Sequence, residues 1–277
     1  MPVLRDMEIG LMFWAGPDPV ATIQNVKALG LRCGQLGIPG DYILDAAAWK
    51  AALDAEGFTI VTVFAGYNGE SYADIPTVQR TVGWIPAPTR AEREKRTYEI
   101  SDFAAAIGVA SIALHVGFVP EDKSDADYIA VRDMVRRVAD YAAKNGQSFA
   151  LETGQEPAPV LLNFFEDVSR PNLRINFDPA NLILYGSGEP IEALGLLTKH
   201  VVTVHCKDGN WPPKDQPGAL GTEMALGQGS VGIDRFIAKL KEIGYRGPLT
   251  IEREIEDQKQ KLEDIKMAIG LLERLRA

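Results

Sequence analysis

This chain of 277 residues lacks abundant cysteine, a basic charge balance and long apolar runs. Its two cysteines, Cys33 and Cys206, are too few for a disulfide framework, and we expect both to be buried, reduced thiols. No apolar run approaches the roughly 18 residues of a membrane span, so no membrane partner is expected. The N-terminus also lacks the basic and apolar regions of a secretory signal. These absences predict a cytoplasmic protein.

The charge balance is acidic, with 29 Lys and Arg against 38 Asp and Glu and a net charge of -9. A protein that binds the phosphates of nucleic acid needs a basic surface, so we expect no nucleic-acid partner. A small anionic substrate is not excluded, because it requires only a local positive site. The hydrophobic content of 46% and the charged content of 24% are ordinary for a globular protein with a large core.

Short β-rich segments alternate with amphipathic helical segments from one end of the chain to the other. The expected strands are 7–14, 32–37, 58–65, 110–116, 148–153, 173–178, 201–206 and 248–253. The expected helices lie near 18–29, 43–56, 90–107, 126–145, 157–169, 189–199, 232–243 and 258–275. Regular alternation with nearly continuous apolar strands is typical of a parallel sheet covered by helices. We predict a single (β/α)8 TIM barrel that forms one domain over residues 1–277.

Two connections, 66–88 and 207–230, are longer than the others and follow the carboxyl ends of expected strands. Long loops at that end of a barrel are often lids or substrate walls, so we expect both to overhang a site. Gly227 and Gly229 precede a helix N-terminus in the second connection, where barrels can hold phosphate. Two glycines alone do not establish a phosphate cradle.

Four side chains of metal-ligand type end four of the expected strands in series: Glu152, Asp178, His205 and Glu252. The carboxyl ends of parallel barrel strands converge on one rim, where such barrels carry their active sites. Burying three carboxylates there without a cation would be costly. One imidazole and three carboxylates suit Mn²⁺, Mg²⁺, Co²⁺ or Zn²⁺ better than a thiophilic metal. We therefore predict one divalent metal ion as cofactor, held by these four residues.

The chain resembles the xylose isomerase-like TIM barrel superfamily, which includes sugar and sugar-phosphate isomerases and epimerases, inosose dehydratases and endonuclease IV-type nucleases. The segments that carry the resemblance are ALHVG (113–117), LETGQE (151–156), NFDPAN (176–181), VHCKD (204–208), GQGSVG (227–232) and GYRGPLTIERE (244–254). The resemblance assigns the same four metal ligands. It also implies a metal-dependent sugar isomerase or epimerase that acts on a small ketose, keto-sugar or other hydroxy-carbonyl compound.

In the mechanism that the resemblance implies, Glu152 and Glu252 are also the acid/base pair. One carboxylate removes the α-proton, an enediolate forms beside the metal, and the other carboxylate returns the proton. A second group of residues is expected to contact the substrate, because each lies at or just beyond a strand end. Its members are Trp14, His115, Glu156, Asn181 and Lys207.

Asn181 keeps the reaction class open. Epimerase-like members of the superfamily have a histidine three residues after the metal-binding aspartate, where this chain has Asn181. The main alternative is a lyase of the inosose dehydratase kind, which would expel a hydroxyl from a keto-polyol. A non-catalytic sugar-binding barrel is less favoured. An endonuclease IV-like nuclease is disfavoured by the acidic charge and by a total of three histidines. A small sugar is thus the expected partner, with homo-oligomerisation left open.

Overall fold

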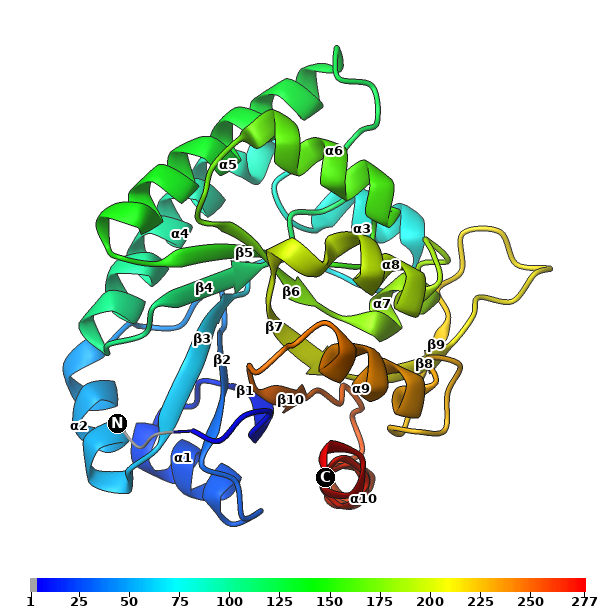
Figure 1. Cartoon of the computed structure of the whole chain (residues 1–277). Helices are drawn as coiled ribbons and strands as arrows, with labels where there is room; N and C mark the ends of the chain where they lie inside the picture. Colours follow the sequence, from blue (N-terminus) through cyan, green and yellow to red (C-terminus); the bar gives the residue numbers. More distant parts are fainter. Residues whose placement is uncertain (1–3) are drawn as a thin grey trace.

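A computed structural model describes residues 4–277, which form a closed barrel of parallel strands surrounded by helices (Figure 1). The barrel strands are β1 (Ile9–Trp14), β2 (Cys33–Ile38), β3 (Thr59–Ala65), β4 (Ser111–Leu114), β5 (Ser148–Glu152), β6 (Leu173–Phe177), β7 (Val201–Cys206) and β10 (Leu249–Ile251). They follow one another in chain order around the barrel, and β10 closes it by pairing with β1. The predicted TIM-barrel fold is confirmed, with every predicted strand in place.

Helices connect successive strands and form the outer layer. They are α1 (Pro19–Lys27), α2 (Ala46–Glu56), α3 (Ile75–Thr81), α4 (Ala87–Ala106), α5 (Ala126–Lys144), α6 (Ala158–Val168), α7 (Pro179–Leu184), α8 (Pro190–Leu197), α9 (Ile233–Glu242) and α10 (Gln258–Arg276). A short 3-10 turn, Thr198–His200, leads from α8 into β7. No helix of the described range 4–277 is long and apolar enough to cross a membrane.

Two of these helices and one hairpin are additions to the predicted pattern. Helix α3 lies inside the long connection 66–88, and α7 begins directly after Asp178. In the connection 207–230, β8 (Asp208–Asn210) pairs antiparallel with β9 (Thr222–Met224). Each added helix, and each strand of the added hairpin, is at most seven residues long. Such short segments span too few periods to give a clear hydrophobic repeat.

Side chains alternate between the two faces of each strand, and this alternation divides the core. The large apolar cluster lies between the strands and the helices and includes Trp49, Phe149 and Phe236. A separate small cluster is formed by Met12, Phe64, Ala113 and Ala150, which face the barrel interior. Other interior positions are buried polar residues, among them Gln35, Thr62, Asn176, Thr203, His205 and Thr250. A polar barrel interior directly below the carboxyl rim is unusual for packing alone, and it supports the site described next.

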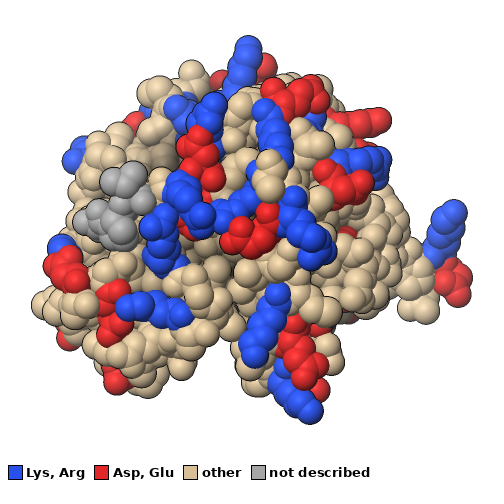
Figure 2. Space-filling view, turned by 60° about the horizontal axis from the view of Figure 1, so that its bottom comes forward, with Lys and Arg blue, Asp and Glu red and all other residues tan. Residues whose placement is uncertain are grey.

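Basic side chains on the face shown in Figure 2 lie beside acidic ones. The buried carboxylate of Glu8 contacts Arg5 and Arg32, and Arg276 of α10 donates a hydrogen bond to the carbonyl of Met7. These contacts join the last helix to the beginning of β1. They therefore tie the two ends of the described chain together where the barrel closes.

Candidate metal centre and active site

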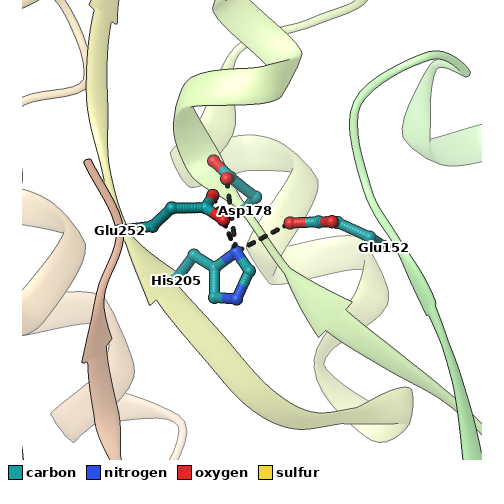
Figure 3. A group of neighbouring side chains, drawn as sticks. All are labelled: Glu152, Asp178, His205 and Glu252. Carbon is teal, nitrogen blue, oxygen red and sulfur yellow. Dashed lines mark ion pairs between the residues drawn. The ribbon is translucent and has the colours of Figure 1, made fainter. Parts of the chain in front are cut away.

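Glu152, Asp178, His205 and Glu252 converge at the carboxyl end of the barrel (Figure 3). Glu152 ends β5, Asp178 follows β6, His205 lies near the end of β7, and Glu252 follows β10. One ligand-type atom from each residue lies within 4.8 Å of the others. Glu152, Asp178 and His205 are buried, whereas 11% of the Glu252 side chain is exposed. The site is thus closed from below and open on the side of Glu252.

The Nδ1 atom of His205 is at the centre of the group. It lies 2.7 Å from Glu152 Oε1, 3.1 Å from Glu252 Oε2 and 3.6 Å from Asp178 Oδ2. Neither His205 Nδ1 nor Asp178 Oδ2 has a hydrogen-bond partner of good geometry among residues 4–277. Buried polar atoms are normally satisfied. Two unsatisfied ligand-type atoms within a cluster of carboxylates fit a cation, so this group can hold a metal ion.

Asp178 is positioned by its neighbours in the chain. Its Oδ1 accepts hydrogen bonds from the backbone N–H groups of Ala180 and Asn181, which makes Asp178 the N-cap of α7. Its own backbone N–H donates to Thr153 Oγ1 at 2.8 Å, and the same hydroxyl donates to the Asp178 carbonyl. Only Oδ2 remains free, and it faces the cluster. Asp178 therefore presents one defined oxygen instead of a mobile carboxylate.

The carboxylates and imidazoles of the site shift one another's pKa values. Burial alone would raise the pKa of Glu152, but His115 and His205 outweigh it and lower that pKa to about 2. Burial raises the pKa of Asp178 to about 6. Burial would lower the pKa of His205, but Glu252 and Glu152 raise it well above its ordinary value. The neighbouring carboxylates therefore favour the protonated form of His205.

A cavity of about 330 Å³ opens above the cluster, which is at the small end of the range for ligand sites. Of the residues predicted to contact the substrate, Trp14, His115, Asn181 and Lys207 line it. The two long connections also contribute to its wall, through Glu70 and Tyr72 from 66–88 and through Leu220, Gly221 and Glu223 from 207–230. The expectation that these connections overhang the site is confirmed. Tyr185 and Glu254 complete the polar lining and were not predicted as contact residues.

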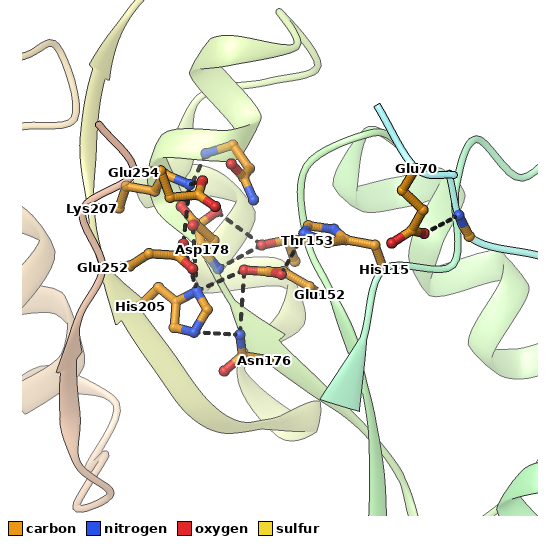
Figure 4. Close-up of polar contacts among 12 residues, drawn as sticks. Glu70, His115, Glu152, Thr153, Asn176, Asp178, His205, Lys207, Glu252 and Glu254 are labelled. Atoms are coloured by element: carbon orange, nitrogen blue, oxygen red, sulfur yellow. Dashed lines mark hydrogen bonds and ion pairs between the residues drawn. The ribbon is translucent and has the colours of Figure 1, made fainter. Parts of the chain in front are cut away.

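His115 and Lys207 approach the group of Glu152, Asp178, His205 and Glu252 from opposite sides (Figure 4). His115 Nε2 lies 2.8 Å from Glu152 Oε2, and the ring packs against Phe64 and Tyr72. Lys207 Nζ donates to Glu252 Oε2 at 3.1 Å and to Glu254 Oε2 at 2.5 Å. Burial would lower the pKa of Lys207, but Glu252 and Glu254 raise it well above its ordinary value. A charged ammonium thus lies in an otherwise acidic cavity.

Glu156 does not line this cavity, contrary to the expectation that it contacts the substrate. Its Oε1 accepts a hydrogen bond from the Val119 backbone N–H at 2.7 Å, and burial raises its pKa to about 7. The turn after β5 directs the side chain towards the segment that follows β4, so proximity to a strand end did not place it in the site. Its observed contact holds that segment in position.

The glycines of GQGSVG do not form an open phosphate cradle. The backbone N–H groups of Gly227, Gly229 and Val231 all donate to the carboxylate of the buried Asp208, as does that of Gly209. A Cβ atom at Gly229 would lie only 2.2 Å from Asp208 Oδ1, so glycine is needed for this approach. The protein's own carboxylate therefore occupies the backbone N–H groups of the loop that precedes α9.

Comparison with known proteins links this geometry to one family. The family model described as xylose isomerase-like TIM barrel matches residues 23–275. The crystal structure of a xylose isomerase domain protein from Planctomyces limnophilus is 46% identical, with a TM-score of 0.93 and 98% of each chain covered. A D-allulose 3-epimerase from Methylomonas sp. has a TM-score of 0.71 over 99% of this chain and 100% of that chain, at 18% identity. This second likeness extends to the fold alone.

One curated relative has a named activity. The L-ribulose 3-epimerase of Methylomonas sp. (strain DH-1) is 30% identical over 125 residues, which cover 43% of this chain and 39% of that protein. The chain spans about half the length, or less, of the curated relatives that it matches.

Proposed function

The chain belongs to the xylose isomerase-like TIM barrel family, and from this premise we propose that it is a metal-dependent sugar isomerase or epimerase. The observation that carries the proposal is the convergence of one histidine and three carboxylates at the floor of the cavity, with two buried ligand-type atoms unsatisfied. The named relative, an L-ribulose 3-epimerase, supports a ketose as the substrate class.

We assign the metal to Glu152, Asp178, His205 and Glu252. Their oxygen-rich set suits Mn²⁺, Mg²⁺, Co²⁺ or Zn²⁺. When bound, the ion would supply Lewis acidity to two adjacent oxygens of a hydroxy-carbonyl substrate. His205 Nδ1 and Asp178 Oδ2 have no other partner among the described residues and would serve as ligands only.

Glu152 and Glu252 are proposed to move the proton. Interactions with His115 and His205 lower the pKa of Glu152, and interactions with His205 and Lys207 lower that of Glu252, although burial opposes both shifts. Both carboxylates are therefore ionised at neutral pH, as a proton acceptor must be. One would remove the α-proton, and the other would return it to the neighbouring carbon or to the opposite face. Lys207 and His115 are placed to donate hydrogen bonds to substrate oxygens.

The cavity favours an uncharged, polyhydroxylated substrate. Glu70, Glu223 and Glu254 add negative charge around the rim, and Lys207 is the only lysine or arginine among the lining residues of this described cavity. Since Asp208 already accepts hydrogen bonds from the GQGSVG backbone before α9, those N–H groups are not available to a phosphate ester. The carboxylates can accept hydrogen bonds from sugar hydroxyls, and the hydroxyl groups of Tyr72 and Tyr185 can both donate and accept them.

A lyase of the inosose dehydratase kind is the second candidate, and Asn181 favours it. Asn181 lines the cavity at the position where epimerase-like relatives have a histidine. An amide can bind a substrate oxygen but cannot transfer a proton at neutral pH. With the same metal and the same first proton transfer, Lys207 could then protonate a departing hydroxyl. Product mass separates the two reactions, because dehydration loses water and isomerisation does not.

The test is to incubate the metal-loaded protein in deuterated water with ketoses, inososes and 3-keto sugars. We expect deuterium uptake at a carbon next to the carbonyl of at least one compound. Glu152→Gln and Glu252→Gln should each slow uptake by roughly 100-fold or more. Glu256→Gln, an exposed change just beyond the site, is the control. Equal uptake by the wild type and both site variants would refute the mechanism. Wild-type uptake no faster than in the absence of protein, for every compound, would leave a non-catalytic sugar-binding barrel as the better explanation.

A further inference from the structure

Three buried polar side chains form a chain of hydrogen bonds directly beneath His205. Gln35 comes from β2, Asn176 from β6 and Thr203 from β7, and none of them lines the cavity. They cannot contact a ligand in the cavity, so their chemistry must act through the residues that they touch. They touch two of the four residues in the metal group.

In each of these contacts the donor and the acceptor can be identified. Asn176 Oδ1 accepts from Thr203 Oγ1 at 2.6 Å and from Gln35 Nε2 at 3.0 Å. Asn176 Nδ2 faces Glu152 Oε1 at 3.4 Å. Turning the Asn176 amide over would point its oxygen at the Glu152 carboxylate, which is repulsive. The carboxylate therefore sets the orientation of Asn176, and Asn176 in turn sets that of Gln35.

The orientation of the Gln35 amide determines which of its atoms faces the imidazole of His205. With its Nε2 committed to Asn176, its Oε1 faces His205 Nε2 at 3.0 Å. A carbonyl oxygen only accepts, so His205 must carry its proton on Nε2 to satisfy the contact. Asn176 Nδ2 also lies 3.2 Å from His205 Nε2 and has a second N–H besides the one that faces Glu152. Nε2 cannot accept that N–H and donate to Gln35 at once, and the shorter Gln35 contact would place two acceptors face to face unless Nε2 donates. The neutral ring is left with its lone pair on Nδ1, the atom at the centre of the carboxylates.

We propose that Gln35 is a positioning residue that holds His205 in the tautomer required for metal binding, with Asn176 and Thr203 as its supports. The proposal rests on the metal site assigned under the proposed function. Metal-ligating histidines commonly donate their second N–H to an acceptor that fixes ring and tautomer, and loss of such an acceptor costs roughly 10- to 100-fold in metal affinity. Here the acceptor is an amide on β2, a strand that does not neighbour β7 in the barrel and lies 170 residues away from His205 in the chain.

The test is direct Mn²⁺ titration by calorimetry of the wild type, Gln35→Met and Gln35→Glu. The methionine removes the acceptor at similar size, and we expect affinity to fall by roughly 10- to 100-fold. The glutamate keeps an acceptor for His205 Nε2–H but loses the donor to Asn176 Oδ1, so its affinity should lie between those of the wild type and Gln35→Met. Thr62→Val is the matched control, since Thr62 is also buried in the barrel interior but its hydroxyl has no partner among the described residues. Its affinity should equal that of the wild type.

A second readout reports the tautomer itself. The chain has only three histidines, His115, His200 and His205, so long-range ¹H–¹⁵N correlation of the Zn²⁺-loaded protein can be assigned with two single variants. We expect the His205 proton on Nε2 in the wild type, and loss of that signal in Gln35→Met. If Gln35→Met does not fold, Thr203→Val, which removes only the donor to Asn176, should show a smaller loss of affinity in the same direction.

The possible failures are distinguishable. A wild-type protein that binds neither Mn²⁺ nor Zn²⁺ refutes the metal site itself. A wild type that binds, together with a Gln35→Met variant of equal affinity and unchanged tautomer, refutes the role of Gln35 and leaves the metal site standing. Equal losses in Gln35→Met and Thr62→Val would show a general packing effect, which also contradicts the proposal.

Discussion

At the scale of single residues, Asp178 shows how one side chain can serve structure and chemistry together. One of its oxygens caps α7 and the other faces the cluster. The sequence Asp178-Pro179 carries both signals, because aspartate is a favoured N-cap and proline is favoured at the first helical position. Interpreting Asp178 only as the end of a strand therefore missed the short helix that holds it.

Metal affinity should rise with pH. In the metal-free protein the pKa of His205 is raised well above its ordinary value by Glu252 and Glu152, despite burial, and a metal can bind only the neutral ring. Binding must release this proton, so affinity should increase up to about tenfold per pH unit near neutrality. Below the Asp178 pKa of about 6, which burial has raised, a second proton competes and the dependence steepens.

Calorimetry in two buffers of different ionisation enthalpy measures this proton release directly. His200→Gln is the control, because His200 lies in the 3-10 turn before β7 and packs against Phe165, away from the site. Affinity that does not change between pH 6 and pH 8 would contradict the protonation state inferred for His205.

At the scale of elements, strand alternation accounts for most of what the sequence predicted correctly. Period-two alternation is local, so it identified the barrel strands and placed Glu152, His205 and Glu252 on the inner face. It could not reveal that Asp208 turns outwards to bind the GQGSVG backbone, or that Glu156 turns towards Val119. Those directions depend on loop backbone, which has no regular period.

Removing the Asp208 carboxylate should destabilise the fold. Asp208→Ala would leave the N–H groups of Gly209, Gly227, Gly229 and Val231 without their acceptor. Gly209 and Val231 are buried, whereas water can reach the exposed Gly227. An unsatisfied buried donor costs about 1–3 kcal/mol, so the loss of acceptor for the two buried N–H groups should lower the free energy of unfolding by roughly 3 kcal/mol. Urea denaturation provides the measurement. Asp215→Ala removes the same charge from the exposed tip of the same connection and should change stability by less than about 0.5 kcal/mol; similar losses in both variants would argue against this role of Asp208.

At the scale of the whole molecule, closure of the barrel brings together residues that are far apart in the chain. Gln35 and Asn176 are 141 residues apart, yet they share a hydrogen bond inside the barrel. Both have polar side chains on inward-facing positions of their strands, which is a detectable signal. Without the strand order and register, however, nothing in the sequence pairs one with the other or with His205.

Metal should stabilise the whole barrel. A cation bound to the folded protein alone adds RT ln(1 + [L]/Kd), which is about 2.7 kcal/mol at a hundredfold excess over Kd. The melting temperature should therefore rise on addition of Mn²⁺ and fall on chelation. Scanning calorimetry should show this rise for the wild type and for the exposed control Glu256→Gln, and little of it for the double variant Glu152→Gln with Glu252→Gln. An equal rise in the double variant would place the stabilising ion elsewhere.

Local patterns were thus sufficient to predict the barrel and the convergence of Glu152, Asp178, His205 and Glu252 at one rim. Each of these follows from periodicity and from the rule that parallel strands end at one rim. The cavity wall, the carboxylate that fills the GQGSVG backbone and the amide beneath His205 required the folded molecule. They are set by loop conformations and by contacts across the barrel, where residues from distant parts of the chain determine which atoms are satisfied and which remain free to bind.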